Sequence, residues 1–330
     1  MAGPAYPISP ENPDHPAKVT VLAGGIGSER DISLQSGACI TEALNQTGCP
    51  VSQADITPDD LSALETETDA FFVALHGKFG EDGSLQRILQ QRNLAYTGSG
   101  PRASELAFDK AKSKEIFKAA GIATPPAIFI NTESDIKQLS GLSASFGPEF
   151  VVKPTCQGSS VGIEIVDTVD AVAAAAKKCF QRYGPTMVEK FIPGREVTVG
   201  ILAGRALPVV EVKSKTGFYD FHAKYIDEAT EYYFESIETA GLNANLKSAA
   251  INCFDALGCR DFARVDFILS EEEIAYALEV NTIPGFTSHS LLPKAAEKAG
   301  IAMPQLVAKI VADALSRHAK DSIRKNPEQF

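Results

Sequence analysis

The chain has 330 residues, of which 44% are hydrophobic and 22% charged, so it can bury an ample core and is long enough for two or three compact units. Its net charge of -11 and pI near 5.0 argue against nucleic acid or an anionic membrane as a partner, because both attract basic surfaces. No apolar run approaches the roughly 20 residues that span a bilayer. The six cysteines lie far apart without metal-ligand spacing, which predicts reduced thiols and a cytoplasmic protein.

The first third of the chain alternates strand and helix signals after a tail over 1–17 that we expect to be flexible. "KVTVLAGG" is an apolar run that ends in glycines, with a helical pattern from about Ser33, and "DAFFVALHG" is followed by a helix from about Gly83. Strands that alternate with helices predict a parallel sheet. We therefore expect an N-terminal parallel α/β domain over 18–104.

A second unit is predicted over 105–192. It begins with a basic amphipathic helix in "FDKAKSKEIFKAAG" that ends at Gly121, and a Pro-Pro pair then marks a boundary before "AIFI". The strands "FVVKPT", "VGIEIV" and "TMVEKF" surround an alanine-rich helix near 169–182.

The third predicted unit, 193–330, is mainly antiparallel. Four strand-like segments follow one another, in "VTVGILA", "ALPVVEVKS", "DFARVDFIL" and "IAYALEVN", and we expect the helix near 303–317 to close the unit. The segment "KSKTGFYDFHAKY" mixes basic and aromatic residues without periodicity, which is typical of a lid, and we place this loop at about 213–232.

The hairpin "ARVDFILSEEEIAYALEVN" carries the strongest pattern for a metal site. Alternation puts Arg264 and Asp266 on one face of the first strand. It puts Glu279 and Asn281 on one face of the second, and a suitable register brings both faces together. Two carboxylates held close repel unless a cation neutralises them, and ligands that are all oxygen select Mg²⁺ or Mn²⁺. The alternative is a solvated sheet face.

Lysines and a glycine-serine loop suggest a phosphate site. Lys153 ends an apolar strand and is followed by "CQGSSVG", and Lys110 stands just before a helix. Small residues let backbone N–H groups wrap phosphate oxygens, although a flexible turn has the same composition. The chain lacks GxxxxGK[ST], and Arg30 replaces the third glycine of GxGxxG, so a dinucleotide-binding fold is disfavoured. "MVEKFIPGRE" offers Glu189, backbone groups from Lys190 to Ile192, and Glu196 at a hinge suited to adenine and ribose.

The N-terminal "GGIGSERDISLQSG" is a third candidate. Glu29 follows the carboxyl end of a parallel strand, where open α/β sheets bind ligands. The alternative is that Ser28 or Asp31 caps the helix and Glu29 only complements its dipole. His76 in "ALHGKFGEDG" lies at the same edge and is either a site residue or structural.

Together these stretches resemble the D-alanine:D-alanine ligases of the ATP-grasp superfamily, from about Val19 to about Ile310. The resemblance rests on motifs in family order: "GGIGSERDISLQSG", "ALHGKFGEDGSLQ", "YTGSG", "DKAKSK", "KPTCQGSSVG", "VEKFIPGREVTVGIL", "FYDFHAKY", "ARVDF" and "EVNTIPGFTSHSLLP". It implies an α/β fold of three ATP-grasp units, with a parallel domain and two α+β units that clasp ATP. It also implies ligation of two D-alanines to D-alanyl-D-alanine for peptidoglycan through an acylphosphate, with release of ADP and phosphate, and a homodimer.

The resemblance assigns ATP-binding and metal-binding roles residue by residue. The residues that it places on ATP are Lys110, Lys153, Ser159, Ser160, Glu189, Lys190, Ile192, Glu196 and Lys224. It implies two Mg²⁺ ions, or Mn²⁺ in their place, with the ligands Asp266, Glu279 and Asn281. These three are the residues that alternation also brings together.

The resemblance likewise assigns the substrate side. Glu29 pairs with the ammonium of the first D-alanine, and a hydrogen-bond chain through Ser159 and Tyr225 closes the lid. Arg264 and the Gly285 N–H donate to the oxyanion. The second carboxylate meets Ser290, which caps a helix, and the backbone of Leu291, while His76 completes the substrate-binding set. Tyr225 indicates the dipeptide-forming branch rather than relatives that favour D-lactate. His222 in the lid and Phe286 depart from the expected pattern and could alter substrate fit.

Two other functions remain open. An ATP-grasp ligase of similar build could join another acid and amine, including D-lactate or a secondary-metabolite precursor. An ATP-binding regulator without turnover is disfavoured, because a degenerate copy is expected to lose some of its charged groups, and Arg264, Asp266 and Glu279 are all present.

Overall fold

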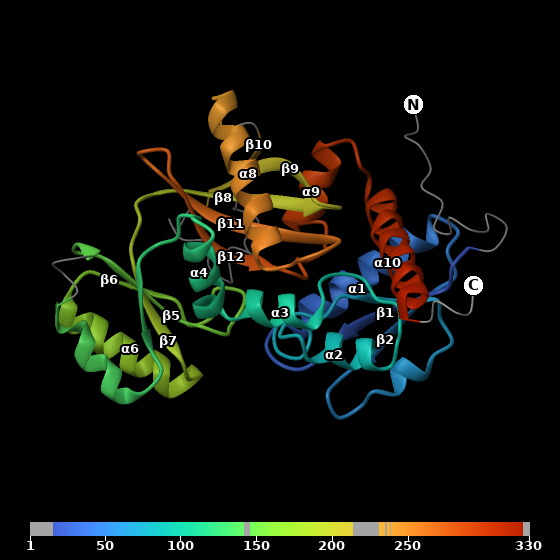
Figure 1. Ribbon diagram of the computed structural model, residues 1–330, viewed down its shortest axis with the longest axis horizontal. Coiled ribbons are helices and arrows are strands. Elements are labelled where there is room, and N and C mark those ends of the chain that lie inside the picture. The colour runs from blue at the N-terminus through green and yellow to red at the C-terminus, as the bar shows by residue number, and fades with distance from the viewer. Residues whose placement is uncertain (1–15, 142–145, 214–230, 235, 238, 326–330) are drawn as a thin grey trace.

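The computed structural model describes residues 16–141, 146–213, 231–234, 236–237 and 239–325. Within these ranges the strands form one parallel sheet of three strands and two antiparallel sheets of four and five strands. Figure 1 shows the three sheets side by side, with the five-stranded sheet between the other two. Most of the predicted lid, including His222, Lys224 and Tyr225, lies outside the described residues, as does most of the predicted N-terminal tail.

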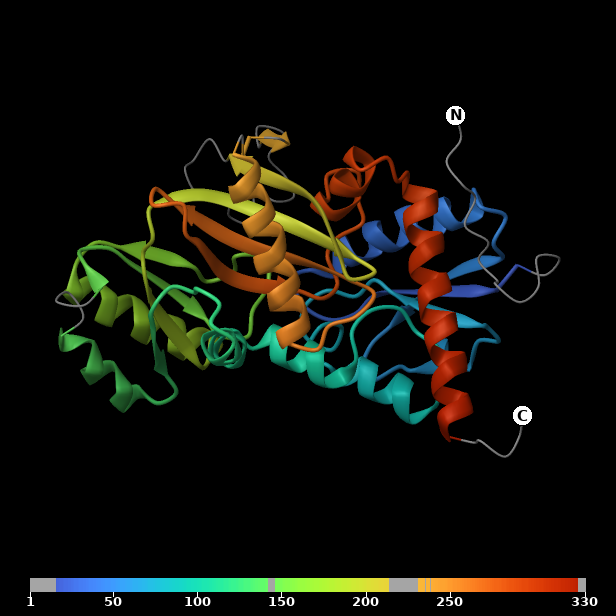
Figure 2. The ribbon, with the colours of Figure 1, turned by 45° about the horizontal axis from the view of Figure 1, so that its top comes forward.

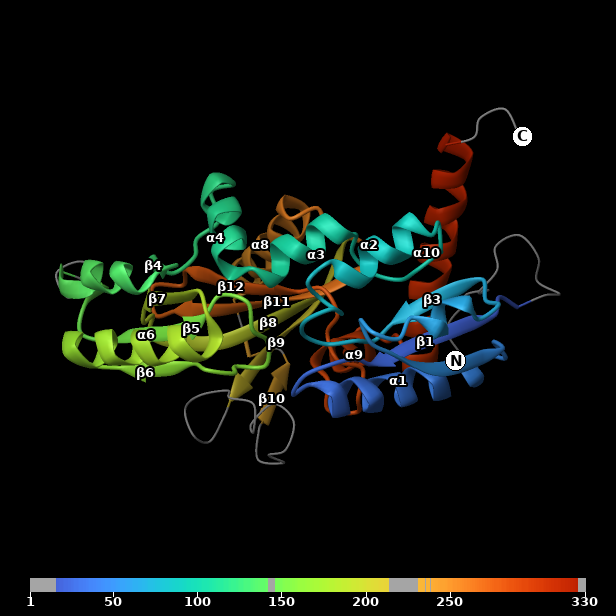
Figure 3. The same cartoon turned by 90° about the horizontal axis from the view of Figure 1, so that it is seen from below.

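The parallel sheet has the order β2-β1-β3, which confirms the parallel pairing predicted for the first third of the chain. Its central strand, β1, is buried along its whole length because every side chain faces protein on both sides of the sheet. The elements are β1 (Val19–Gly24), α1 (Arg30–Asn45), β2 (Val51–Ile56), η1 (Ser62–Glu65), β3 (Ala70–Val73), α2 (Ser84–Gln91) and α3 (Pro101–Phe108). Figure 3 shows α3 and α2 following one another along one side of the molecule.

The four-stranded sheet has the order β4-β7-β5-β6, and α6 packs against it over Phe150, Val152 and Val172. The helix that precedes this sheet in the chain, α4, packs through Phe117 on the core of the five-stranded sheet. It begins after Asp109, whose carboxylate accepts hydrogen bonds from the first free N–H groups. The elements are α4 (Lys110–Ala119), β4 (Ala127–Ile130), η2 (Glu133–Gly141), β5 (Phe150–Pro154), β6 (Glu164–Val166), α6 (Val169–Tyr183) and β7 (Thr186–Lys190).

The five-stranded sheet has the order β10-β9-β8-β11-β12 and is antiparallel throughout, as the run of consecutive strands predicted. Figure 2 shows α8 lying across this sheet. The elements are β8 (Gly194–Leu202), β9 (Arg205–Lys213), β10 (Glu231–Phe234), α8 (Ala240–Ala256), β11 (Phe262–Ser270), β12 (Ala275–Asn281), α9 (Leu291–Lys298) and α10 (Met303–Lys325).

The expectation that the helix near 303–317 closes the antiparallel unit is wrong. That helix is α10, and its apolar face packs on α1, where Leu306 and Ile310 share a core with Ile40 and Leu44. The sheet is covered instead by α8, whose Leu246 and neighbours pack on it. No single helix of the described chain is long and apolar enough to cross a membrane, and α9 and α10 pass that test only as a pair bent by 104°.

Candidate active site

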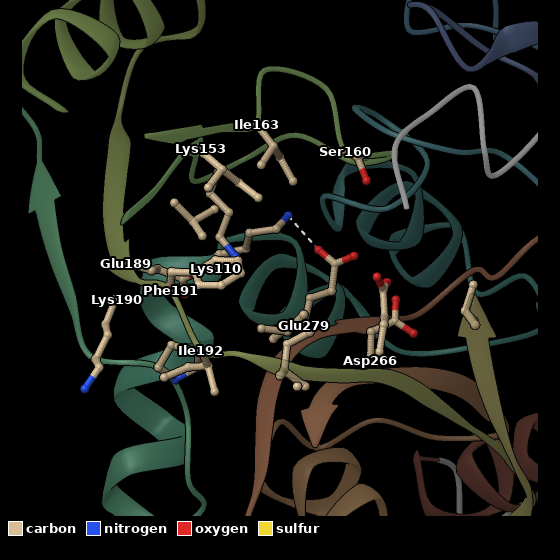
Figure 4. A pocket seen from close by; sticks show the side chains of 18 of the residues that line it. Lys110, Lys153, Ser160, Ile163, Glu189, Lys190, Phe191, Ile192, Asp266 and Glu279 are labelled. Carbon is tan, nitrogen blue, oxygen red and sulfur yellow. Dashed lines mark ion pairs between the residues drawn. The ribbon is translucent and has the colours of Figure 1, made fainter. Parts of the chain in front are cut away.

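Two adjoining cavities lie where the three sheets meet. The larger, of about 460 Å³, lies between the four-stranded and five-stranded sheets (Figure 4). The smaller, of about 40 Å³, lies between the loops of the parallel sheet and the end of the β11–β12 hairpin. Lys110, Gln157 and Glu279 line both cavities, so a ligand in one reaches the edge of the other.

Lys110 stands at the junction because α4 begins there. Its Nζ lies 2.9 Å from Glu279 Oε2 and donates to the Gln157 carbonyl at 2.7 Å. Burial opposes the charge on Lys110, but the Glu279 carboxylate outweighs that effect, so the pKa of Lys110 is raised. The pair therefore stays charged in the buried site, with a cation from α4 facing a carboxylate from β12.

Glu189 on β7 is held by two lysines. Lys153 Nζ on β5 lies 2.5 Å from Oε2, and Lys114 Nζ on α4 lies 2.6 Å from Oε1. Burial opposes ionisation of Glu189, yet the two cations lower the pKa of this carboxyl. Burial lowers the pKa of Lys114 to about 8, although the lysine also donates to Thr124 Oγ1 and to the Pro125 carbonyl. Lys114 is not among the residues predicted from the sequence for this site. Its signal was the four-residue spacing from Lys110, which puts both lysines on one face of α4.

Four more residues predicted for the nucleotide line the same large cavity, namely Ser160, Lys190, Ile192 and Glu196. Ser159, also predicted for the nucleotide, lines the smaller cavity instead. The Lys190 side chain points away from the Lys153–Glu189 pair, so only its backbone faces the cavity there (Figure 4). Ser159 and Ser160 both have positive φ, 51° and 57°, a strained conformation for non-glycine residues that is concentrated at functional loops.

The β11–β12 hairpin has the register that the alternation required. Asp266 pairs directly with Glu279, and Arg264 with Asn281, which confirms that the two faces turn together. The Arg264 guanidinium donates to both Asp266 oxygens at 2.9 Å, and Thr198 Oγ1 donates to the same carboxylate at 2.6 Å. The Asp266 carboxylate is therefore held by three donated hydrogen bonds, and Arg264 is fixed beside it.

The fourth member of the hairpin cluster contacts a residue that the sequence analysis did not single out. The Asn281 amide is satisfied when its nitrogen donates to Glu81 Oε1 at 2.7 Å and its oxygen accepts from Arg264 Nη2 at 3.1 Å. Glu81 is buried, and its other oxygen accepts from the Gly77 N–H at 2.6 Å. Burial, and then the charge of Glu29, raises the pKa of Glu81 to about 8. No periodicity links a loop glutamate to a distant hairpin, so only the motif "HGKFGEDG" pointed to this region.

Glu29 occupies the N-cap position of α1 but makes no side-chain cap bond, so the alternative that Ser28 or Asp31 caps the helix is wrong. Its carboxylate instead accepts from Ser159 Oγ and lines the smaller cavity. Gly77, with φ of 71°, gives it room, because a Cβ there would lie 2.8 Å from Glu29 Oε2. Glu29 therefore bridges the parallel sheet and the glycine-serine loop.

His76 lines the same small cavity and is buried. Its Nε2 lies 3.4 Å from Ser36 Oγ, and it also bonds to the backbone of Ile283. Burial lowers the pKa of His76 to about 4, so the imidazole is neutral at pH 7.

Ser290 and Leu291 lie at the start of α9, as expected, but the Ser290 hydroxyl does not cap that helix. Its Oγ accepts from the Thr287 N–H at 2.9 Å instead. Gly285 lies against it, since a Cβ at Gly285 would approach Ser290 Oγ to 2.7 Å. Phe286, whose effect on substrate fit stays a prediction, is buried, and its ring packs edge-on against Phe72 and Phe262.

The donor chemistry of the hairpin suits a hard divalent cation. Within the described ranges no group of three or more His, Cys, Asp or Glu side chains is placed to hold a metal. The hairpin instead offers the carboxylates of Asp266 and Glu279 with the amide of Asn281, an all-oxygen set of the kind that Mg²⁺ and Mn²⁺ accept.

Comparison with known proteins gives a consistent result. The family model "D-ala D-ala ligase C-terminus" matches residues 116–312, and "D-ala D-ala ligase N-terminus" matches residues 51–99. A D-alanine–D-alanine ligase from Methylacidiphilum infernorum is 41% identical over 300 residues, which cover 91% of this chain and 96% of the relative.

Solved structures are similar over the same length. The D-alanine–D-alanine ligase from Bacillus anthracis has a TM-score of 0.80 at 33% identity, over 92% of this chain and 99% of its own. The same enzyme complexed with ATP has a TM-score of 0.78 at 29% identity, with the same coverage. The predicted fold class, an ATP-grasp architecture with a parallel α/β domain and two α+β units, is thereby confirmed. The chain belongs to the D-alanine–D-alanine ligase family.

Proposed function

We propose that the chain is an ATP-dependent ligase that joins two D-alanines into D-alanyl-D-alanine, a peptidoglycan precursor, and releases ADP and phosphate. The observation that carries this proposal is the junction of the two cavities at Lys110 and Glu279. A nucleotide in the larger cavity would present its terminal phosphate to an amino acid in the smaller one. Phosphoryl transfer requires this in-line meeting of donor and acceptor.

ATP is assigned to the larger cavity. Glu189, Ile192 and Glu196 would hold the adenosine end, with the backbone from Lys190 to Ile192. Lys153 would contact the phosphates, and Lys110 would reach them from the junction, where its charge is already supported by Glu279. Ser159 and Ser160 would cover the phosphates with the glycine-serine loop. Lys224 stays a prediction for the γ-phosphate.

Asp266, Glu279 and Asn281 would hold two Mg²⁺ ions, or Mn²⁺. Bound there, the ions would neutralise the phosphate charge and let the terminal phosphoryl group be attacked by an anion. The residues support this assignment by position, since β-pairing brings the three oxygen donors together at the junction of the cavities: Asp266 lines the larger one, Asn281 the smaller one and Glu279 both. Arg264 holds the Asp266 carboxylate in place for the same purpose.

The substrates occupy the smaller cavity and its mouth. Glu29 would pair with the ammonium of the first D-alanine, whose carboxylate oxygen attacks the γ-phosphorus and forms an acylphosphate. The amine of the second D-alanine then attacks the acyl carbon, and phosphate leaves with that oxygen. Arg264 and the Gly285 N–H would donate to the oxyanion that forms in this step. Little covalent chemistry falls to the protein, which positions groups and supplies charge.

The second D-alanine would be recognised at the start of α9. Its carboxylate would meet Ser290 and the backbone of Leu291, where the positive end of the helix favours an anion. His76, neutral and buried, would line the first substrate's side. Tyr225 stays the predicted link from the lid to Ser159 and Glu29. All six cysteines are unpaired, which supports the expected cytoplasmic location, and a homodimer stays a prediction.

Product analysis tests the proposal. The purified chain is incubated with ATP, Mg²⁺ and D-alanine, phosphate release is followed, and the product is identified by mass spectrometry, with L-alanine as the control. We expect one phosphate for each alanyl-alanine and no reaction with L-alanine. ATP binding without a dipeptide would contradict the proposal. A reaction that needs D-lactate or another acceptor would move the chain to the alternative ligase.

A further inference from the structure

We propose that Glu81 is a positioning residue that fixes the amide of Asn281, so that the amide oxygen faces the Arg264–Asp266 pair where the metal ions are assigned. This inference rests on the proposed metal role of Asn281. Glu81 lines the smaller cavity and belongs to the loop that follows β3, whereas Asn281 ends β12. The contact therefore joins the parallel-sheet domain to the metal-binding hairpin.

The orientation of an asparagine amide matters because its two ends are nearly the same shape and opposite in chemistry. The oxygen can accept a hydrogen bond or bind a cation, while the NH₂ group can do neither. Asn281 faces Glu81 Oε1 at one end and Arg264 Nη2 at the other, at 2.7 and 3.1 Å. Arginine only donates, so the end beside Arg264 must be the oxygen, and Glu81 supplies the acceptor that the nitrogen then needs.

Glu81 is itself fixed by the backbone. Its Oε2 accepts from the Gly77 N–H at 2.6 Å, and its side chain is buried. Both oxygens therefore face donors, one from the backbone and one from the asparagine. Two donors favour the ionised carboxylate and so oppose the burial that raises the pKa of Glu81. A glutamine, with the same shape, would have to turn its NH₂ group toward one of these donors, and one of the two hydrogen bonds would be lost.

This donor–acceptor logic predicts a rescue. Glu81→Gln alone loses a bond, and Asn281→Asp alone sets two carboxylates against each other. In the double variant the introduced amide accepts from Gly77 and donates to the introduced carboxylate, whose other oxygen accepts from Arg264. All three contacts are then satisfied. A glutamate that only filled space in the loop would give no such reversal.

The probe is Mn²⁺ titrated by electron paramagnetic resonance in the presence of a non-hydrolysable imido analogue of ATP. Replacing a group that orients a metal ligand typically weakens metal binding by roughly 10–100-fold, so we expect Glu81→Gln to raise the Mn²⁺ Kd by about tenfold or more. The double variant should recover most of that loss. Asp82→Asn is the matched control, because Asp82 accepts from the Phe79 and Ser84 N–H groups of the same loop without touching Asn281.

The outcomes separate the two proposals. Failure of the unsubstituted chain to bind Mn²⁺ with the analogue would overturn the metal site itself. Three results would each overturn the positioning role. The Mn²⁺ Kd of Glu81→Gln could equal that of the unsubstituted chain, or Asp82→Asn could raise the Kd as much as Glu81→Gln does. The third is a double variant whose Mn²⁺ Kd is no lower than that of Glu81→Gln. Should Glu81→Gln not fold, thermal unfolding of Asn281→Asp against the double variant decides, and a double variant that is no more stable contradicts the inference.

Discussion

Lys114 Nζ lies 2.6 Å from Glu189 Oε1, and both side chains are almost wholly buried, at 0% and 2% exposed. The same carboxylate also binds Lys153, so one anion neutralises two cations beneath the larger cavity. A buried charge that loses its partner is costly, whereas an exposed pair contributes little. Lys114 thus supports Glu189 and Lys153 from the side opposite the cavity.

Lys114→Met should lower the free energy of unfolding by about 1–3 kcal/mol, because Glu189 Oε1 and the Pro125 carbonyl lose a buried donor while Lys153 still neutralises the carboxylate. It should also raise the KM for ATP, because Glu189 and Lys153 lose their support. Urea unfolding and steady-state kinetics measure the two effects. Lys112→Met on the same helix is the control, since Lys112 is 46% exposed and its pairs should contribute no more than about 1 kcal/mol. Equal losses in both variants would contradict this account.

Gly77→Ala should impair the first D-alanine site. The added Cβ would lie 2.8 Å from Glu29 Oε2, so the carboxylate must move, and kcat/KM for D-alanine should fall at least about tenfold. Gly48→Ala is matched to it in backbone, with φ of 80°, but nothing lies within 4 Å of its Cβ. Both variants should lose about 1–2 kcal/mol of stability to the left-handed conformation. A similar fall in kcat/KM for Gly48→Ala would show that backbone strain, and not displacement of Glu29, causes the loss.

Arg264→Ala should lower kcat by on the order of 10² or more, because an oxyanion donor is lost. Phosphate release at saturating substrates measures this, and thermal unfolding reports the cost of leaving Asp266 without its arginine. Arg205→Ala, at an exposed position in the same sheet, should keep its activity. Turnover near that of the unsubstituted chain would remove Arg264 from the proposed step.

His76 should make the fold sensitive to acid. Its pKa is about 4 when folded and 6.5 as the ordinary value, so between these pH values the unfolded chain binds the extra proton. The contribution of the neutral His76 to the free energy of unfolding is therefore fully present above pH 6.5. It is lost as the pH falls toward 4, by about 3 kcal/mol in total. His76→Gln lacks this loss, so the difference in unfolding free energy between the two chains should shrink as the pH falls from 7 to 4.5. Parallel pH curves would show that His76 does not titrate this way.

The hairpin illustrates what the sequence could predict. Alternation along two strands placed Asp266 and Glu279 on facing sides, and β-pairing at that register follows from geometry alone. The parallel sheet followed in the same way from alternating strands and helices. Periodicity captures such relations because they repeat along the chain.

Contacts between residues far apart in the sequence could not be predicted. Glu81 reaches Asn281 through the tertiary fold, and Lys114 looked like one more surface lysine in a basic helix until its neighbours buried it. The packing of α10 was predicted wrongly for the same reason. An apolar helix face does not specify its partner, and this one packs on α1 and not on the antiparallel sheet. Ser290 lies at a helix start as predicted, but its hydroxyl accepts from the Thr287 N–H of the preceding turn and does not cap the helix.

The most direct test of the central claim follows an oxygen atom. D-alanine labelled with ¹⁸O in both carboxylate positions is supplied with ATP and Mg²⁺, and the released phosphate is examined by mass spectrometry. Attack of the carboxylate on the γ-phosphorus, followed by displacement by the second amine, predicts one ¹⁸O atom in each phosphate released. Phosphate without ¹⁸O, formed alongside dipeptide, would contradict the acylphosphate route and the roles assigned to Arg264 and Gly285.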